Sequence, residues 1–205
     1  MKKYVFLFAS FWLLSCQTQV SIENIQEPPL FNKMDTTFAN VYQPLDGTWK
    51  GTFKIYNDTV LGPIKDQLLN NPSLSTLEEL QLKLADTIMV TQVYESLSPY
   101  FQTVNITDYY PNQDKTVKSK GVNKVQDGKM WCVVIKPDDM VIHAGSTDDP
   151  QTIIWQRNRK EPLSKEYFRE TVLESTYEII GWGYYGNADT TQMPPYWFYS
   201  KYIRQ

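Results

Sequence analysis

The sequence contains little of what metal centres and many hydrolase sites are built from. Its 205 residues include one histidine, His143, and two cysteines. A single imidazole excludes metal sites that use several histidines and leaves one possible imidazole base. The sequence also has no Gly-x-Ser-x-Gly segment to seat a serine nucleophile. We therefore expect neither a metal nor a cofactor, and we assign no catalytic residue from the sequence.

The chain also lacks an excess of basic residues and a long apolar run near its start. Its formal net charge at pH 7 is −3. This charge argues against nucleic acid as a partner and against electrostatic adhesion to an anionic membrane. The apolar run from Tyr4 to Ser15 is shorter than the roughly 20 residues that a helix needs to span a bilayer.

The first residues have the layout of a secretory signal. A basic start precedes the apolar run, which ends in Leu13-Leu14-Ser15-Cys16. This segment resembles a bacterial lipoprotein signal, which is cleaved before a cysteine that then carries a lipid, although Leu14 is bulkier than the usual occupant. An ordinary signal peptide with a chance cysteine is the alternative. The resemblance implies a signal at residues 1–15, a lipid on Cys16, and a place in the bacterial cell envelope, at the outer membrane on its periplasmic or surface side.

The two cysteines have different expected roles. If Cys16 is acylated, Cys132 is the only thiol left, so no disulfide can form within the chain. Cys132 lies in the apolar run MWCVVI, where it is either a small buried hydrophobic side chain or a reactive thiol.

The rest of the chain divides into a linker and one domain. Residues 16–44 are polar and hold no periodic pattern for long, which predicts a tether with a short docked piece at 30–38. After Trp49 the side chains alternate between two faces, as in a half-buried antiparallel strand. The remaining length suits a single domain at residues 45–205.

Strands are expected to dominate this domain. After the first, we predict strands at 88–95, 100–109, 116–125, 130–136, 140–143, 152–157, 166–172, 177–184 and 196–203, with turn residues between them. One helix is predicted at 73–86, where leucines recur at helical spacing after a Ser/Thr start. Consecutive strands without intervening helices favour a mainly β, antiparallel up-and-down barrel of about 8–10 strands with one inserted helix.

The stretch LDGTWKGTF at the start of the domain carries a second resemblance. Gly47-Thr48-Trp49 ahead of an antiparallel meander resembles the signature of the lipocalin and wider calycin group. The resemblance implies that Trp49 plugs one end of a barrel and packs against a basic side chain near the chain end, where Arg204 stands. The inserted helix, and a last strand with no helix after it, depart from the family pattern. A core tryptophan in a β-sandwich is the alternative.

Two further motifs have ordinary structural explanations. GWGYYG at 181–186 fits the G-x-G-x-x-G string of dinucleotide-binding folds. No helix is expected after it, and no acidic residue lies about 20 positions on, so its glycines are expected to kink the strand or leave room for aromatic side chains. The acidic pairs at 138–139 and 148–149 lack the spacing of a calcium loop and are typical of turns.

Aromatic and charged side chains on the later strands are the candidates for ligand binding. Trp155 and Arg157 share one strand face, so an inward Trp155 would bring Arg157 inward. A buried guanidinium needs an anionic partner, which could be Glu170, another acid or a ligand. An outward Arg157 stays open, as does the direction of His143. The candidate residues are Trp155, Arg157, His143, Trp182 and Tyr185.

We therefore expect a lipid-anchored envelope protein that binds a small apolar or amphipathic ligand in a barrel cavity. A structural or assembly lipoprotein that docks another envelope protein is one alternative, and a lyase or isomerase acting on a chromophore-like ligand is the other. A closed cavity lined by Trp155 and Trp182 would favour binding. A filled barrel with exposed aromatic residues at 196–202 would favour docking, and His143 near an inward carboxylate at an open mouth would favour an enzyme.

Overall fold

The computed structural model describes residues 26–29, 36–58, 66–137, 139–160 and 162–205. The expected signal at 1–15, Cys16 and the first part of the expected tether lie outside these residues. Within the described part of the chain, no helix is long and apolar enough to cross a membrane.

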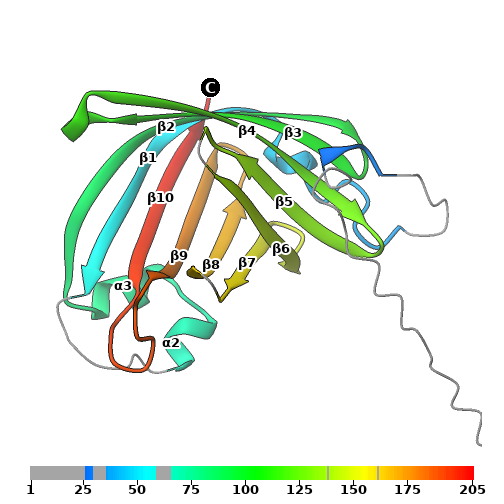
Figure 1. Ribbon diagram of the computed structural model, residues 1–205. Helices are drawn as coiled ribbons and strands as arrows, with labels where there is room; N and C mark the ends of the chain where they lie inside the picture. Colours follow the sequence, from blue (N-terminus) through cyan, green and yellow to red (C-terminus); the bar gives the residue numbers. More distant parts are fainter. Residues whose placement is uncertain (1–25, 30–35, 59–65, 138, 161) are drawn as a thin grey trace, which may run out of the picture.

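Ten antiparallel strands close into a barrel (Figure 1). Each strand pairs with the next in the chain, and pairing of the first with the last, from Trp49–Arg204 to Asn57–Tyr196, closes the ring. This closure confirms the predicted up-and-down barrel and excludes the sandwich. The strands are β1 (Gly47–Asp58), β2 (Leu82–Ser98), β3 (Phe101–Tyr110), β4 (Lys115–Gln126), β5 (Lys129–Ile135), β6 (Met140–Asp149), β7 (Thr152–Arg159), β8 (Leu163–Val172), β9 (Thr176–Gly186) and β10 (Tyr196–Arg204).

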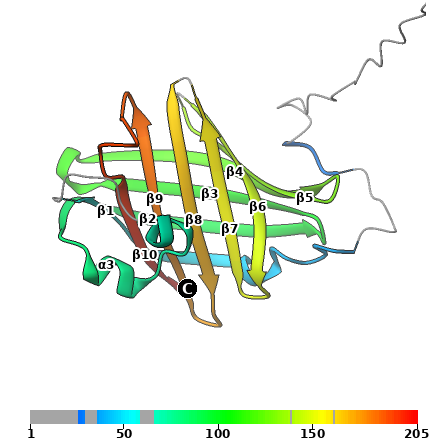
Figure 2. The ribbon, with the colours of Figure 1, turned by 90° about the horizontal axis from the view of Figure 1, so that it is seen from below.

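The two walls of the barrel cross each other. Figure 2 shows β2, β3 and β4 running across β6, β7, β8 and β9. Inward side chains of both walls form the main hydrophobic core, which includes the fully buried Trp49, Tyr177 and Tyr202. A sheet that closes on itself leaves its inward side chains to fill the space or to line a cavity.

The hairpins use the turn residues that the sequence supplies. Asp127 and Gly128 join β4 to β5 and both have positive φ, at 54° and 66°. They connect the paired residues Gln126 and Lys129, so the loop has two residues. A two-residue loop with positive φ at both positions matches the twist of the flanking strands, and Asp-Gly is a preferred sequence for it.

The predicted helix at 73–86 is too long and is corrected. The structure has two short helices, α2 (Asp66–Asn70) and α3 (Leu74–Glu79), and β2 already begins at Leu82. Residues 82–86 pair with the end of β1, with Leu84 opposite Tyr56 and Leu82 opposite Asp58. Extension of the barrel wall thus satisfies backbone groups that a continued helix would have paired internally, so tertiary pairing overrides the local helical pattern.

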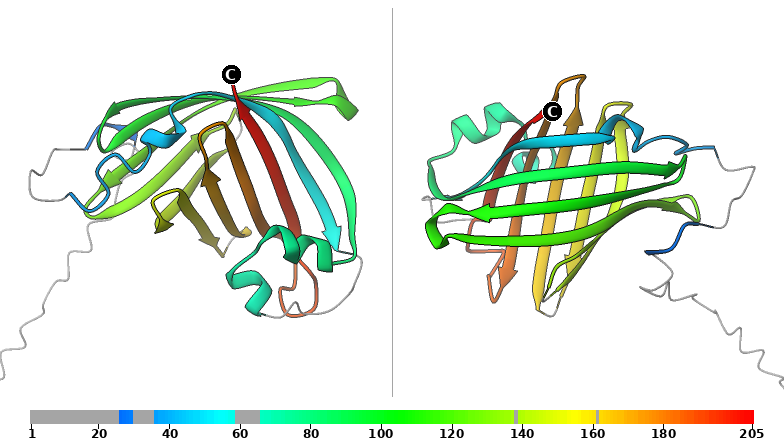
Figure 3. Two further views of the ribbon diagram at one scale, coloured as in Figure 1. Left: turned by 180° about the vertical axis from the view of Figure 1, so that it is seen from behind. Right: turned by 90° about the horizontal axis from the view of Figure 1, so that it is seen from above.

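The short helices cover part of the outer wall. Figure 3 shows α2 and α3 beside the end of the barrel where β1 stops and β10 starts. Leu77 of α3 joins a second hydrophobic cluster on the outer face, made with side chains of β8, β9 and β10. The Trp182 indole donates a hydrogen bond to the Leu69 carbonyl at 2.7 Å, which ties α2 to β9. Beneath these helices, the outer face of β9 is therefore apolar as well as its inner face.

Trp49 and Arg204 meet at one end of the barrel. Trp49 is fully buried, its indole N–H donates to the Leu45 carbonyl at 2.7 Å, and the Arg204 guanidinium carbon lies 4.2 Å from the centre of its ring. The guanidinium also donates to the carbonyls of Asp46, Pro44 and Glu174. Its positive charge faces the indole while its N–H groups satisfy backbone carbonyls at the strand ends.

Packing at this closed end begins before Leu45. Tyr42, in the expected tether, is 2% exposed and stacks on Trp155, with ring centres 6.2 Å apart. Its hydroxyl donates to the Lys124 carbonyl at 3.0 Å. Its carbonyl accepts a hydrogen bond from the buried Gln102 side chain at 2.7 Å. The tether boundary at residue 44 therefore lies too late, because Tyr42 belongs to the packed end of the barrel.

Candidate ligand-binding site

A cavity of about 250 Å³ lies inside the barrel. Its apolar wall combines branched aliphatic side chains of β2, β3, β5 and β6 with Phe53, Trp155 and Phe168. Its polar wall consists of the side chains Gln92, Asp108, Ser119, Asn123, Lys136, His143, Glu166 and Glu170. A mostly apolar cavity with a few inward polar groups is the usual form of a small-molecule site.

The cavity reaches the surface at the end away from Trp49. β1, β3 and β5 run in the same direction, and Trp49 stands near the start of β1. Asp108 and Tyr110, at the end of β3, are half-buried, and Lys136, just after β5, is exposed. These three lining residues form a mouth opposite the plugged end.

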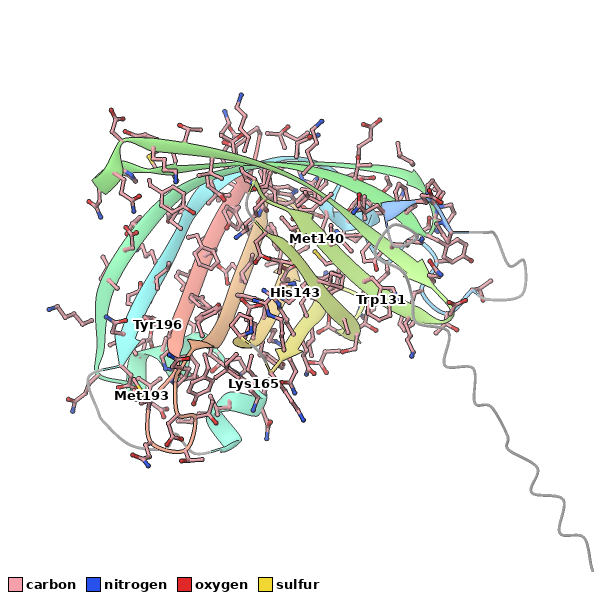
Figure 4. The ribbon with its side chains drawn as sticks, viewed as in Figure 1. Trp131, Met140, His143, Lys165, Met193 and Tyr196 are labelled. Carbon is pink, nitrogen blue, oxygen red and sulfur yellow. The ribbon has the colours of Figure 1, made fainter. Side chains whose placement is uncertain are left out.

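Four polar side chains form one cluster at the cavity wall, in which His143 and Glu166 line the cavity and Arg157 and Tyr185 contact Glu166. Arg157 of β7 stands directly opposite Glu166 of β8, and its guanidinium lies 3.5 Å from the carboxylate. His143 of β6 approaches the same carboxylate oxygen with Nε2 at 3.0 Å. The Tyr185 hydroxyl of β9 donates to the other oxygen at 2.8 Å. Figure 4 shows His143 pointing into the barrel.

These partners decide the charge state of Glu166. Burial would raise the pKa of its carboxyl, but hydrogen bonds from His143 and Tyr185 and the charges of His143 and Arg157 outweigh burial. The net result is a lowered pKa, so Glu166 is a carboxylate at neutral pH. Burial beside Glu166 raises the pKa of Tyr185, which therefore stays a hydroxyl donor.

Two glycines make room for large side chains of the site. A Cβ on Gly183 would lie 2.6 Å from the Tyr185 hydroxyl, so the bare backbone lets the phenol reach back to Glu166. A Cβ on Gly145 would lie 2.3 Å from the Trp155 ring, which occupies that space instead. Gly183 belongs to GWGYYG, so this glycine leaves room for an aromatic side chain, as one of the two expectations for the motif had it.

Glu170 lies deeper in the cavity in a different environment. The Trp155 indole N–H donates to its carboxylate at 2.9 Å. Burial raises its pKa to about 7, although hydrogen bonding by Trp155 and Tyr177 opposes the rise. The two inward glutamates of β8 therefore differ at neutral pH: Glu166 is ionised, and Glu170 is close to half-ionised.

Two polar atoms on β4 extend the polar wall. Ser119 and Asn123 are 5% and 3% exposed and both line the cavity. The Asn123 amide donates to Gln102 at 2.9 Å. Within the described part of the chain, its Oδ1 atom and the Ser119 hydroxyl have no hydrogen-bond partner. Buried polar atoms of this kind are costly unless something pairs with them.

Cys132 also lines the cavity. Burial, reinforced by the Glu170 charge, raises the pKa of its thiol well above the ordinary range. A thiol that stays protonated is a poor nucleophile. Of the two roles left open by the sequence, the structure supports a small hydrophobic side chain of the cavity wall.

The structure brings most of the predicted ligand-binding residues together. Trp155, Arg157, His143 and Tyr185 all belong to the inner wall or its polar cluster, which settles the open directions of Arg157 and His143 as inward. The anionic partner of Arg157 is Glu166, with Asp139 at 3.9 Å as a weaker one.

The expectation that Trp182 lines the cavity is corrected. Trp182 points to the outer face of β9, where it stacks on Tyr167 and bonds to Leu69. Successive side chains of a strand point to opposite sides, so Trp182 and the inward Tyr185 cannot share a face. The helical cover on the outside explains why an outward tryptophan is 5% exposed.

Glu166, Ser119 and Asn123 were missed by the sequence reasoning, and Glu170 was considered only as a partner for Arg157. The two glutamates could have been found from EYFRE, because Glu166, Phe168 and Glu170 are every second residue of a strand and therefore share one face. Ser119 and Asn123 carry no such signal, because single polar residues in a strand are ordinary on an outer wall. Among the described residues, no group of three or more His, Cys, Asp and Glu side chains could hold a metal ion.

No protein-family model matches the chain, and no curated protein matches it. Among solved structures, one described as EF1p2_mFAP2b bound to DFHBI is 11% identical, with a TM-score of 0.41, over 82% of this chain and all of the other. A redesigned beta barrel, b11L5F_LGL, is 13% identical, with a TM-score of 0.39, over 83% of this chain and 99% of the other. These likenesses are distant, and the barrel described above stands on its own strand pairing.

Proposed function

We propose that the barrel binds a small apolar or amphipathic molecule in its cavity. The observation that carries the proposal is a mouth-accessible cavity of about 250 Å³ whose wall is mainly apolar but presents polar atoms without protein partners. Burial of apolar ligand surface contributes roughly 25 cal/mol per Å², and the inward polar groups orient the ligand. Trp49 and Arg204 act as the structural plug, as the resemblance to the calycin group implies.

Docking of another envelope protein is less well supported. That alternative requires a filled barrel with exposed aromatic residues at 196–202. Trp197 and Tyr202 are fully buried, and Tyr196 is 46% exposed. Trp197, Phe198 and Tyr202 of β10 thus pack inside or against the barrel, and Tyr196 is the exposed aromatic side chain of this strand.

A proton-transfer enzyme is the second candidate, and one contact favours it. His143 lies 3.0 Å from Glu166 on the cavity wall, which is the arrangement of an imidazole held by a carboxylate. Such a pair could move a proton on a bound ligand, as in a lyase or isomerase. Replacement His143→Gln should then abolish turnover of the identified ligand while leaving its binding largely intact. Equal turnover by the variant would eliminate this candidate.

We propose further that the chain is anchored in the bacterial envelope by a lipid on Cys16. The support is the apolar run that ends in Leu13-Leu14-Ser15-Cys16. Labelled palmitate should be incorporated into the wild-type protein in bacterial cells and absent from Cys16→Ser, which should also leave the membrane fraction. Retention of label by the variant would refute lipidation at this position.

Native mass spectrometry of protein purified from its own envelope tests the binding function. The wild-type protein should carry a small-molecule adduct. Trp155→Phe, which alters the cavity wall, should lose much of it, whereas Trp182→Phe, on the outer face, should retain it. If the wild-type protein carries no adduct and binds no amphipathic test compound, the proposed binding function is wrong.

A further inference from the structure

Glu170 is an enclosed acid whose neighbours leave its charge uncompensated. By contrast, Glu166, the other inward acid of the same strand, contacts Arg157 and His143. Among the described residues, no ion pair includes Glu170. The groups that hydrogen-bond its carboxyl are neutral: the Trp155 indole, at 2.9 Å, and the Tyr177 hydroxyl. A carboxylate held inside a protein is ordinarily paired with a cation or returns to its protonated form.

The side chains around Glu170 are aromatic. Trp155 supplies the indole beside the carboxylate, and Tyr94, Tyr177 and Tyr202 stand close enough for its charge to act on their hydroxyls. All four are less than 9% exposed, and Trp155, Tyr94 and Tyr202 line the cavity. Aromatic faces carry partial negative charge and attract organic cations, and this attraction is stronger where water is excluded.

We propose that the ligand of this cavity is an organic amine, whose protonated nitrogen pairs with Glu170 and lies against the surrounding aromatic rings. This inference rests on the proposed function and names the chemical class of its ligand. The apolar part of the amine would lie along Phe53, Phe168 and the aliphatic wall, toward the mouth. A carboxylate beneath aromatic rings supplies both forms of attraction that a cation finds in a protein interior.

An anionic ligand is disfavoured, because the cations near the cavity already have acidic neighbours. Arg157 is the cation that could receive an anion, but it is already paired with Glu166 at 3.5 Å and Asp139 at 3.9 Å. Lys136 stands at the exposed mouth with Asp108 on the same cavity wall. The deep part of the cavity therefore contains an acid without a matching base.

In the deep part of the cavity, Glu170 changes its charge near pH 7, whereas the titratable side chains around it do not. The titratable side chains that face it are Tyr94 of β2, Cys132 of β5, Tyr177 of β9 and Tyr202 of β10, and burial raises the pKa of each. They stay neutral below pH 9. Because burial brings the Glu170 pKa to about 7, amine binding should weaken as the pH falls from 8 to 5.5.

Three probes of similar size, each with a phenyl ring and a short polar end, test the proposal. They are phenethylamine, 2-phenylethanol and phenylacetate, which are cationic, neutral and anionic at pH 8. Isothermal titration calorimetry would compare them on the wild-type protein, Glu170→Gln and Glu178→Gln. Glu178 is the matched control, because it pairs with Lys201 at 3.1 Å on the outer wall. Circular dichroism would confirm that each variant is folded.

Phenethylamine should bind at least about tenfold more tightly than the other two at pH 8. This preference should vanish in Glu170→Gln, persist in Glu178→Gln and shrink at pH 5.5. Equal binding of the three probes, or a preference for phenylacetate, would overturn the amine assignment while leaving the binding function standing. Failure of all three to bind would overturn the assignment, and absence of a native adduct as well would remove the binding function with it.

Discussion

The two inward glutamates of β8 lie four positions apart but have opposite surroundings. Glu166 meets an arginine, a histidine and a tyrosine hydroxyl, which hold its pKa down against burial. Glu170 meets an indole and phenols, which leave burial dominant. One strand thus places an ion-paired acid beside the polar cluster and an uncompensated acid in the aromatic part of the same cavity.

The raised pKa of Glu170 predicts a pH dependence of stability. Because the folded-state pKa of about 7 exceeds the ordinary value of 4.5, the folded protein binds this proton more tightly, and stability falls as the pH rises from 5 to 8. Glu170→Gln should therefore be about as stable as the wild-type protein at pH 5 and more stable by about 2–3 kcal/mol at pH 8. Urea unfolding at the two pH values measures this, and a difference that does not change with pH would contradict it.

The contacts of Arg204 lead to a prediction about stability. Arg204→Ala removes the contact with Trp49 and the hydrogen bonds to three carbonyls at the closed end. The free energy of unfolding should fall by about 1–3 kcal/mol. Lys201→Ala, which loses an exposed ion pair on the same strand, should leave the free energy of unfolding nearly unchanged. Equal losses in urea unfolding would show that Arg204 is an ordinary surface residue.

The helices α2 and α3 pack on the outer wall of the barrel and bury a second hydrophobic cluster there. Leu77 is 9% exposed against β9 and β10, while Leu74 on the same helix is 45% exposed. Leu77→Ala should lower the free energy of unfolding by about 1–3 kcal/mol, and Leu74→Ala should change it by less than about 0.5 kcal/mol. Chemical denaturation separates the two outcomes, and similar values would mean that α3 is not packed on the barrel.

The same helical cover explains what could and could not be predicted from the sequence. Strand existence and order were predictable, because turn residues mark each hairpin, as Asp127-Gly128 does. The direction of Trp182 was not, because β9 is apolar on both faces and has no alternation from which to tell inside from outside. The helix end at Glu79 was misplaced because Leu80 and Leu84 continue the helical spacing of the earlier leucines, although the strand β2 already starts at Leu82.

The polar cluster of the site could not be predicted from the sequence, because strand register brings its residues together. The sequence shows that Trp155 and Arg157 share a face, but it does not show which face turns inward. Pairing of Arg157 with Glu166 across two strands follows from the β7–β8 register. His143 joins them from a third strand, a contact that no spacing in a single chain segment reveals.

The whole molecule is a barrel that is closed at Trp49 and contains a cavity beyond it. Val90 and Val93 of β2 offer a matched test, since Val90 lines the cavity at 6% exposure and Val93 faces outward at 39%. Phenylalanine at the first position fills cavity space, and at the second it extends into solvent. If Val90→Phe does not fold, Val134→Phe on β5, which also lines the cavity, replaces it.

Calorimetric titration of these variants, with whichever of the three phenyl probes binds the wild-type protein best, tests whether the ligand lies inside the barrel. We expect Val90→Phe to weaken binding at least about tenfold and Val93→Phe to match the wild-type protein. Unchanged binding by folded Val90→Phe and Val134→Phe would place the ligand outside the barrel and contradict binding in the cavity.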